Sequence, residues 1–144
     1  MIWTYKNKQF TSIEDFPEGC FGFIYCITNI TNGKKYIGKK VLSFKRKKNF
    51  GKKQIESLQD KRLKKYEVVI KESDWNDYTG SCIELNEDIK KGHQIKREII
   101  EFAFNSRELT YLEVKLLFKY NVLETSDYYN RNILSKFFKK KELL

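Results

Sequence analysis

The stretch GFIYCITNITNGKKYIG, residues 22–38, constrains the fold of this chain more than any other. Two short runs rich in β-branched and aromatic residues flank an Asn-Gly pair at positions 32–33. Asn-Gly is a strong hairpin-turn signal, because both residue types tolerate positive φ. The stretch therefore predicts a β-hairpin in which Tyr25 and Tyr36 are neighbours on one small sheet.

The length of the chain is that of one ordinary domain. Its 144 residues, of which 40% are hydrophobic and 15% aromatic, can bury a single core. Pro17 is the one proline, and no Gly/Ser-rich linker divides the sequence. We therefore expect a single domain over residues 1–144.

Positive charge is concentrated in one segment of the sequence. The net charge is +10, and residues 34–72 hold 15 Lys/Arg against 4 Asp/Glu, whereas the rest holds 14 against 15. Such a segment attracts polyanions, and its binding depends on salt through counterion release. A solvated lysine-rich face is the simpler interpretation. Because the segment begins within the tyrosine hairpin, we favour contact with a nucleic acid.

The cysteines and the histidine do not predict a metal site. Cys20, Cys26 and Cys82 form no CxxC pair, and His93 completes no zinc-ligand spacing with them. The thiols are typical of small buried hydrophobes in a reducing compartment. The sequence also has no apolar run of about 18 residues and no signal-peptide pattern. We expect a cytoplasmic protein with no membrane partner.

The remaining patterns predict a mixture of helices and strands. Residues 1–20 form an irregular lead-in that could hold a short strand. The expected strands are at 66–70 and, as a third principal strand, at 95–104. The expected helices are one whose face holds Ile55, Leu58, Arg62, Leu63 and Tyr66, one that runs to Lys91 and is capped by Ser81 and Glu84, and one from Asn105 to about Tyr120.

Glu113 falls inside the apolar stripe of the helix predicted at 105–120. A carboxylate on an inward face is costly unless a cation meets it. The spacing of the sequence is compatible with two roles for Glu113, a structural salt bridge and a functional carboxylate.

Hydrolysis of a phosphodiester needs three kinds of group that this chain contains. A carboxylate can hold a divalent metal ion, and an arginine can clamp phosphate oxygens. A tyrosine can act as a base if a nearby lysine lowers its pKa from about 10. The candidates are Glu113, Arg46, Tyr25 and Lys35. Phosphate-binding GxxxxGK[ST] and GxGxxG loops, a GxSxG elbow and a two-metal carboxylate cluster are all missing from the sequence.

The ordered set of these residues resembles the GIY-YIG nuclease superfamily. Its two motifs correspond to GFIY at 22–25, which has one extra residue, and YIG at 36–38. By this resemblance the catalytic residues are Tyr25, Lys35, Tyr36, Arg46, Glu113 and Asn130, with Asn132 a less favoured alternative to Asn130.

The resemblance implies an α+β fold, with a small three-stranded antiparallel sheet flanked by helices. The core would span about residues 21–133, with a basic insertion at about 45–72. The implied reaction is metal-dependent hydrolysis of DNA. Tyr25 would accept a proton from water with help from Lys35, and Tyr36 would position the water or phosphate. Arg46 would hold the phosphate, Glu113 would bind Mg²⁺ or Mn²⁺, and Asn130 would brace the site.

The WNDYTGS element at 75–81 is similar to that of the phage-type subgroup related to free-standing Seg homing endonucleases. A phage-encoded enzyme would act in the host cytoplasm. DNA affinity would come from the basic insertion, the C-terminal tail or a homodimer. The predicted DNA-binding residues are Lys39, Lys40, Lys45, Lys47, Lys48, Lys52 and Lys53. The alternatives are a non-catalytic nucleic-acid-binding module on the same scaffold and a restriction or structure-specific nuclease.

Overall fold

The computed structural model describes residues 1–58 and 65–144, which form two compact units. The larger unit comprises Met1–Leu42 and Asp74–Leu144, and the smaller unit comprises Ser43–Ser73. The predicted basic insertion at 45–72 falls within the smaller unit.

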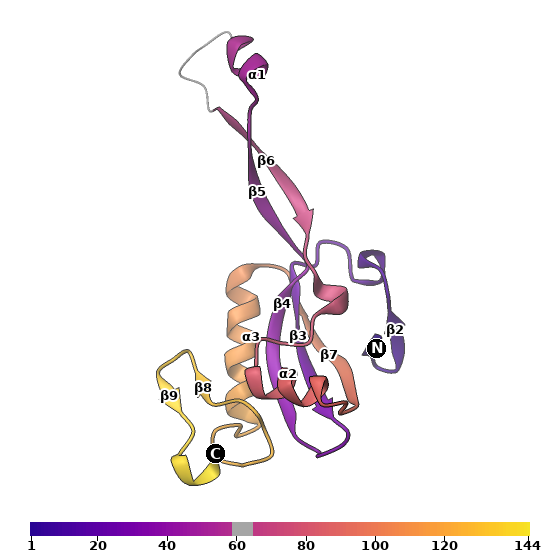
Figure 1. Ribbon diagram of the computed structural model, residues 1–144, viewed down its shortest axis with the longest axis vertical. Helices are drawn as coiled ribbons and strands as arrows, with labels where there is room; N and C mark the ends of the chain where they lie inside the picture. The colour runs from indigo at the N-terminus through magenta and orange to yellow at the C-terminus, as the bar shows by residue number, and fades with distance from the viewer. Residues whose placement is uncertain (59–64) are drawn as a thin grey trace. The chain divides into compact units, whose positions relative to one another are not determined.

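A five-stranded mixed sheet forms the centre of the larger unit, with the strand order β2-β1-β7-β3-β4 (Figure 1). Its strands are β1 (Trp3–Tyr5), β2 (Lys8–Phe10), β3 (Gly22–Asn29), β4 (Lys35–Val41) and β7 (Ile95–Ala103). The predicted antiparallel trio is present as β7, β3 and β4. The prediction of three strands was wrong, because β1 pairs parallel with the second edge of β7 and carries β2 with it.

The predicted tyrosine hairpin is confirmed in the pairing of β3 with β4, which places Tyr25 opposite Gly38 and Ile27 opposite Tyr36. The connection is longer than a two-residue turn. The side chain of Asn29 accepts hydrogen bonds from the backbone N–H groups of Thr31 and Asn32. A wider loop therefore forms, and in it Gly33 alone adopts a positive φ of 81°.

Helices cover both faces of this sheet, and each face has its own core (Figure 1). α3 (Ser106–Lys119) packs against the face that buries Ile24 and Ile37. The opposite face buries Trp3, Phe23, Tyr25, Trp75 and Leu85, which include residues from the short helix η2 (Trp75–Asp77) and from α2 (Ile83–Lys90). The sheet therefore separates the side chains of alternate residues into two layers.

The helix caps agree with the sequence in one case and not in the other. Asn105 caps α3 as predicted, because its side chain accepts a hydrogen bond from the Glu108 N–H at 2.8 Å. The predicted capping box of Ser81 and Glu84 was wrong. α2 starts after Cys82, and no side chain caps it. Ser81 instead lies within hydrogen-bond distance of Tyr36.

The smaller unit is an antiparallel hairpin of β5 (Ser43–Asn49) and β6 (Tyr66–Glu72), with a short helix α1 (Lys52–Glu56). The predicted strand at 66–70 is confirmed. Among the described residues of the helix predicted on the face from Ile55 to Tyr66, Ile55 lies in α1, whereas Tyr66 begins the paired strand β6. Arg62 and Leu63 of that predicted helix lie outside the described residues.

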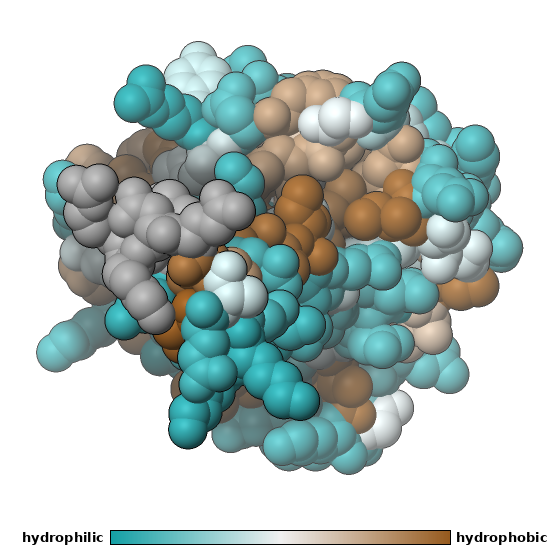
Figure 2. Space-filling view, turned by 90° about the horizontal axis from the view of Figure 1, so that it is seen from above, coloured by the Kyte–Doolittle hydropathy of each residue, from teal (hydrophilic) through white to brown (hydrophobic). Residues whose placement is uncertain are grey.

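Short elements complete the described chain, namely η1 (Ile13–Asp15), β8 (Asn132–Ile133), β9 (Phe137–Phe138) and η3 (Lys141–Leu143). No helix in the described part of the chain is long and apolar enough to cross a membrane. The face seen in Figure 2 is largely hydrophilic, with hydrophobic residues gathered in patches between the polar ones.

Candidate active site

Three tyrosines meet on the sheet face opposite α3, and we call them the tyrosine cluster. Tyr25 comes from β3, Tyr36 from β4 and Tyr78 from the segment that follows η2. The Tyr25 ring centroid lies 6.2 Å from that of Tyr36 and 6.0 Å from that of Tyr78. Tyr25 is 1% exposed. The structure thus brings together the two motif tyrosines and one tyrosine that the sequence analysis did not select.

Two glycines make room for this cluster. A Cβ atom on Gly38 would lie 2.7 Å from Cζ of Tyr25, a distance that such atoms do not tolerate. Gly80 adopts a φ of +84°, and a Cβ there would lie 3.3 Å from both the Tyr25 hydroxyl and the Tyr36 ring. The YIG and YTG segments therefore end in glycine because the Tyr25 phenol occupies the space beside each one.

Burial raises the pKa of Tyr25 well above its usual value, and the neighbouring Tyr36 and Tyr78 raise it further. The prediction that Lys35 lowers this pKa was wrong. Successive residues of a strand face opposite sides, so Lys35 lies on the other face of β4 from Tyr36. There its charge lowers the pKa of Cys26 against the dominant effect of burial.

Lys40 holds the segment before Tyr78 to β4. Its Nζ lies 2.5 Å from Oδ1 of Asp74 and 3.9 Å from the centroid of the Tyr78 ring. The hydrogen bond from Lys40 lowers the pKa of Asp74. Only 16% of the Lys40 side chain is exposed. Lys40, predicted to contact phosphate, therefore has local partners within the described residues.

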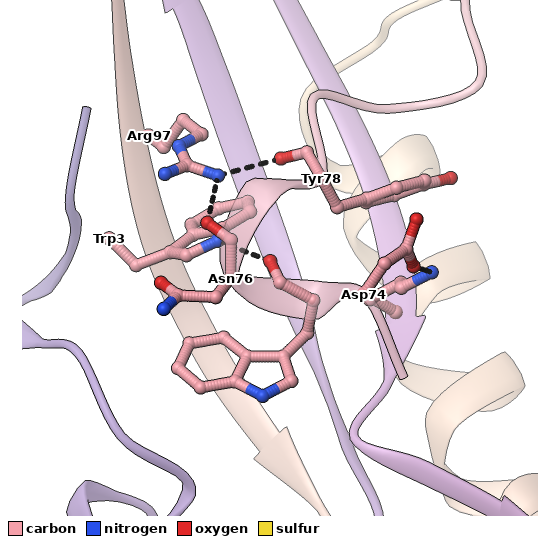
Figure 3. A network of polar contacts seen from close by, with 7 residues as sticks. Trp3, Asp74, Asn76, Tyr78 and Arg97 are labelled. Atoms are coloured by element: carbon pink, nitrogen blue, oxygen red, sulfur yellow. Dashed lines mark hydrogen bonds and ion pairs between the residues drawn. The ribbon is translucent and has the colours of Figure 1, made fainter. Parts of the chain in front are cut away.

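Arg97 of β7 holds the same segment from the opposite end (Figure 3). Its Nη1 donates to the backbone oxygens of Asn76 at 2.9 Å and Tyr78 at 2.8 Å, and its Nη2 donates to that of Met1. The guanidinium also lies 4.6 Å from the Trp3 ring, and Trp3 Nε1 donates to the Trp75 oxygen. These contacts fix the position of Tyr78 relative to the sheet.

Glu113 of α3 is half-buried, and burial raises its pKa, with the charge and backbone N–H of Lys39 opposing the change. The Lys39 ammonium donates a 2.9 Å hydrogen bond to the hydroxyl of Thr110, which lies on α3 with Glu113. Burial is the main cause of the raised pKa of both Tyr25 and Tyr36, and the Glu113 charge makes a smaller contribution to each.

A cleft of about 650 Å³ lies at the exposed edge of β4. It opens between the segment before α2 and the helix α3, and Arg131 and Glu84 form an ion pair among its lining residues. The lining includes Tyr36, Ile37, Ser81, Glu84, Glu113, Asn130 and Arg131. The volume is within the range of pockets that take a small ligand.

Asn130 binds the backbone of the edge strand with both ends of its amide. Its Oδ1 accepts from the Ile37 N–H at 3.1 Å, and its Nδ2 donates to the Ile37 oxygen at 2.8 Å. Asn130 is 6% exposed, whereas Asn132 is exposed at the rim of the cleft. Asn130 therefore fixes the strand that carries Tyr36, and its carbonyl oxygen already has a partner.

Residues 3–133 match the family model described as "Putative endonuclease segE, GIY-YIG domain". The chain belongs to this GIY-YIG family. The match confirms both the resemblance and its Seg-like subgroup. Comparisons with curated proteins and with solved structures returned no significant match.

The other predicted residues of the GIY-YIG domain lie in the smaller unit. Arg46 is on β5 and is exposed, and it belongs to a different unit from the tyrosine cluster. The predicted DNA-binding residues of this unit are all exposed, namely Lys45, Lys47, Lys48, Lys52 and Lys53.

Sequence reasoning missed two residues that shape the GIY-YIG site. Tyr78 was not selected, although its YTG segment repeats the spacing of YIG. Arg97 was not selected, although it lies between Ile95 and Ile99 on the inward side of an alternating strand. A charged residue in a series of inward apolar positions was the available signal.

A divalent metal ion is the cofactor that the family implies. The described residues contain no group of three or more His, Cys, Asp and Glu side chains that could hold a metal ion. A single half-buried carboxylate fits Mg²⁺ or Mn²⁺, because Mg²⁺ keeps several waters and binds through one or two carboxylates together with substrate phosphate. The Glu113 carboxylate is the residue of the cleft that fits such an ion.

Proposed function

We propose that this GIY-YIG domain is a metal-dependent DNA endonuclease, with Glu113 as its metal-binding residue. The observation that carries the proposal is the position of Glu113, which is half-buried and lines the β4 cleft with Tyr36. A desolvated carboxylate in a cleft is an unfavourable arrangement that a bound cation would relieve.

Each side chain has a role that follows from its surroundings. A Mg²⁺ or Mn²⁺ ion bound by Glu113 would supply positive charge that stabilises the phosphate transition state. Tyr36 would orient the water or the phosphate through its hydroxyl, which faces Ser81 at 3.3 Å. Arg46 would clamp phosphate oxygens, and Asn130 would keep the β4 edge rigid.

Tyr25 would accept the proton, but it does not start as a phenolate. Its burial and raised pKa keep the phenol protonated near neutral pH. Positive charge must therefore approach the tyrosine cluster before Tyr25 can act as a base.

Plasmid cleavage tests the proposal directly. The full chain is incubated with supercoiled plasmid and Mg²⁺ or Mn²⁺, with EDTA as a control. Glu113→Gln should abolish nicking and linearisation, while Glu108→Gln on the same helix should leave them unchanged. Undiminished cleavage by Glu113→Gln would exclude Glu113 as the metal-binding residue.

A non-catalytic nucleic-acid-binding module is the second candidate, favoured by the deep burial and raised pKa of Tyr25. It would bind DNA in a salt-sensitive manner and cleave nothing with any divalent metal. Homing, restriction and structure-specific uses of an active enzyme would be separated by cleavage at one long site, at many short sites or in branched DNA.

A further inference from the structure

The β5–β6 hairpin, which we call the ribbon, pairs seven residues of Ser43–Asn49 with seven of Tyr66–Glu72. None of the described residues of the smaller unit is buried. A two-stranded hairpin without a core is at best marginally stable in water. The ribbon therefore has the properties of an element that is completed by binding a partner.

The pairing register gives the ribbon two different faces, because directly opposed residues of an antiparallel pair point the same way. Lys45 lies opposite Ile70, and Lys47 lies opposite Val68. We call the surface made by these four residues the Lys45 face. Val68 is 55% exposed and Ile70 is 74% exposed. The Lys45 face thus combines two exposed aliphatic side chains with two cations.

The opposite face of the ribbon differs in chemistry. It places Arg46 opposite Val69 and Lys48 opposite Glu67. Each face carries one acidic residue, Glu67 on this face and Glu72 opposite Ser43 on the other. On this face the aliphatic Val69 is half-buried, and the exposed apolar residue is Phe44, opposite Lys71. The predicted catalytic arginine therefore lies on the face opposite to Val68 and Ile70.

We propose that the Lys45 face of the ribbon lies in the major groove of duplex DNA, with Val68 and Ile70 against base edges and Lys45 and Lys47 toward the phosphates. This proposal rests on DNA being the substrate of the domain. The major groove, about 12 Å wide, admits a two-stranded ribbon, whereas the minor groove is about 6 Å wide. The thymine methyl group, which aliphatic side chains contact, lies in the major groove.

Removal of thymine methyl groups provides the test. The full chain is titrated in EDTA against mixed-sequence duplexes of about three helical turns, containing either thymine or uracil, and binding is measured by fluorescence anisotropy. Uracil should weaken wild-type binding by about fourfold for each thymine methyl group that the ribbon touches. The double variant Val68→Thr/Ile70→Thr, which retains one methyl group at each position, should bind thymine duplexes more weakly and should distinguish the two pools less than the wild type does.

The matched control is Val69→Thr, which makes a similar change on the opposite face. Threonine is well suited to strands, so neither variant should unfold the ribbon. Val69→Thr should discriminate thymine from uracil as the wild type does. The proposal is overturned if the wild type binds both pools equally, or if the double variant discriminates between them as strongly as the wild type.

Plasmid cleavage by the same proteins separates this proposal from the proposed nuclease function. Metal-dependent cleavage without any effect of uracil would overturn the groove proposal and leave the nuclease proposal intact. Weaker binding to uracil duplexes without any plasmid cleavage would support the groove proposal and contradict the nuclease proposal. A wild-type chain that binds neither pool and cleaves no plasmid would overturn both.

Discussion

At the scale of single residues, the spacing between Tyr25 and its neighbouring glycines determines the site. The Tyr25 phenol lies over Gly38, so any side chain at position 38 must displace it. Gly38→Ala should destabilise the fold by about 1–3 kcal/mol, as overpacking of a core does, and should also reduce cleavage. Urea unfolding measures the first effect. Gly51→Ala, with space for the added methyl group, is the control and should change stability little.

The ionised form of Glu113 should destabilise the folded chain, although it is the form that would bind a metal ion. Its pKa is raised in the folded chain, so ionisation of Glu113 is less favourable there than in the unfolded chain. The contribution of this pKa shift to the free energy of unfolding is present at low pH, and it is lost as the pH rises through the pKa of Glu113 in the folded chain. Glu113→Gln should therefore raise the Tm in EDTA at pH 8 and have less effect at pH 4. A lower Tm for the variant at pH 8 would contradict this prediction.

Metal binding by Glu113 can be measured without any cleavage assay. A ligand that binds only the folded state raises its stability in proportion to the logarithm of ligand concentration above Kd. Mg²⁺ or Mn²⁺ should raise the Tm of the wild type at pH 8, and the effect should shrink as acid protonates Glu113. Glu113→Gln should show no such shift, whereas Glu108→Gln should match the wild type. An equal shift in all three proteins would locate the ion elsewhere.

At the scale of elements, the segment 74–80 depends on one buried arginine. Arg97 satisfies the backbone oxygens of Asn76 and Tyr78 (Figure 3) and also that of Met1. Lysine cannot reproduce the planar fork of donors, so Arg97→Lys should cost about 1–3 kcal/mol. Hydrogen exchange across residues 74–80 should accelerate, and kcat should fall because Tyr78 loses its fixed position. Arg107→Lys, at an exposed position of α3, should change neither quantity.

The sequence predicts those elements whose signals are local. Alternation and an Asn-Gly pair identify the β3–β4 hairpin, and Asn105 identifies the start of α3. The parallel pairing of Trp3 with Arg97 joins residues far apart in the chain, and no local pattern encodes it. The position of Lys35 was predictable, since adjacent strand residues face opposite sides. The depth at which Tyr25 is buried was not, because several separate elements enclose it.

At the scale of the whole molecule, the distribution of charge is uneven. The segment 34–72 carries all of the excess positive charge, and the remaining residues are nearly neutral. Many of these cations are on the ribbon and α1, where they are exposed and have few acidic neighbours. Binding of a polyanion should therefore depend on where a lysine is removed, and not only on how many are removed.

Salt titration can show whether the position or only the number of lysines governs DNA binding. The slope of the logarithm of the binding constant against the logarithm of salt concentration reports how many phosphates a protein neutralises. Replacing Lys45 and Lys47 by glutamine should reduce that slope by about 2 and weaken binding across all DNA sequences. Lys90→Gln/Lys91→Gln removes the same charge from exposed positions at the end of α2, outside the basic segment. If this second pair lowered the slope equally, net charge alone would govern DNA affinity, and the ribbon would have no special part in it.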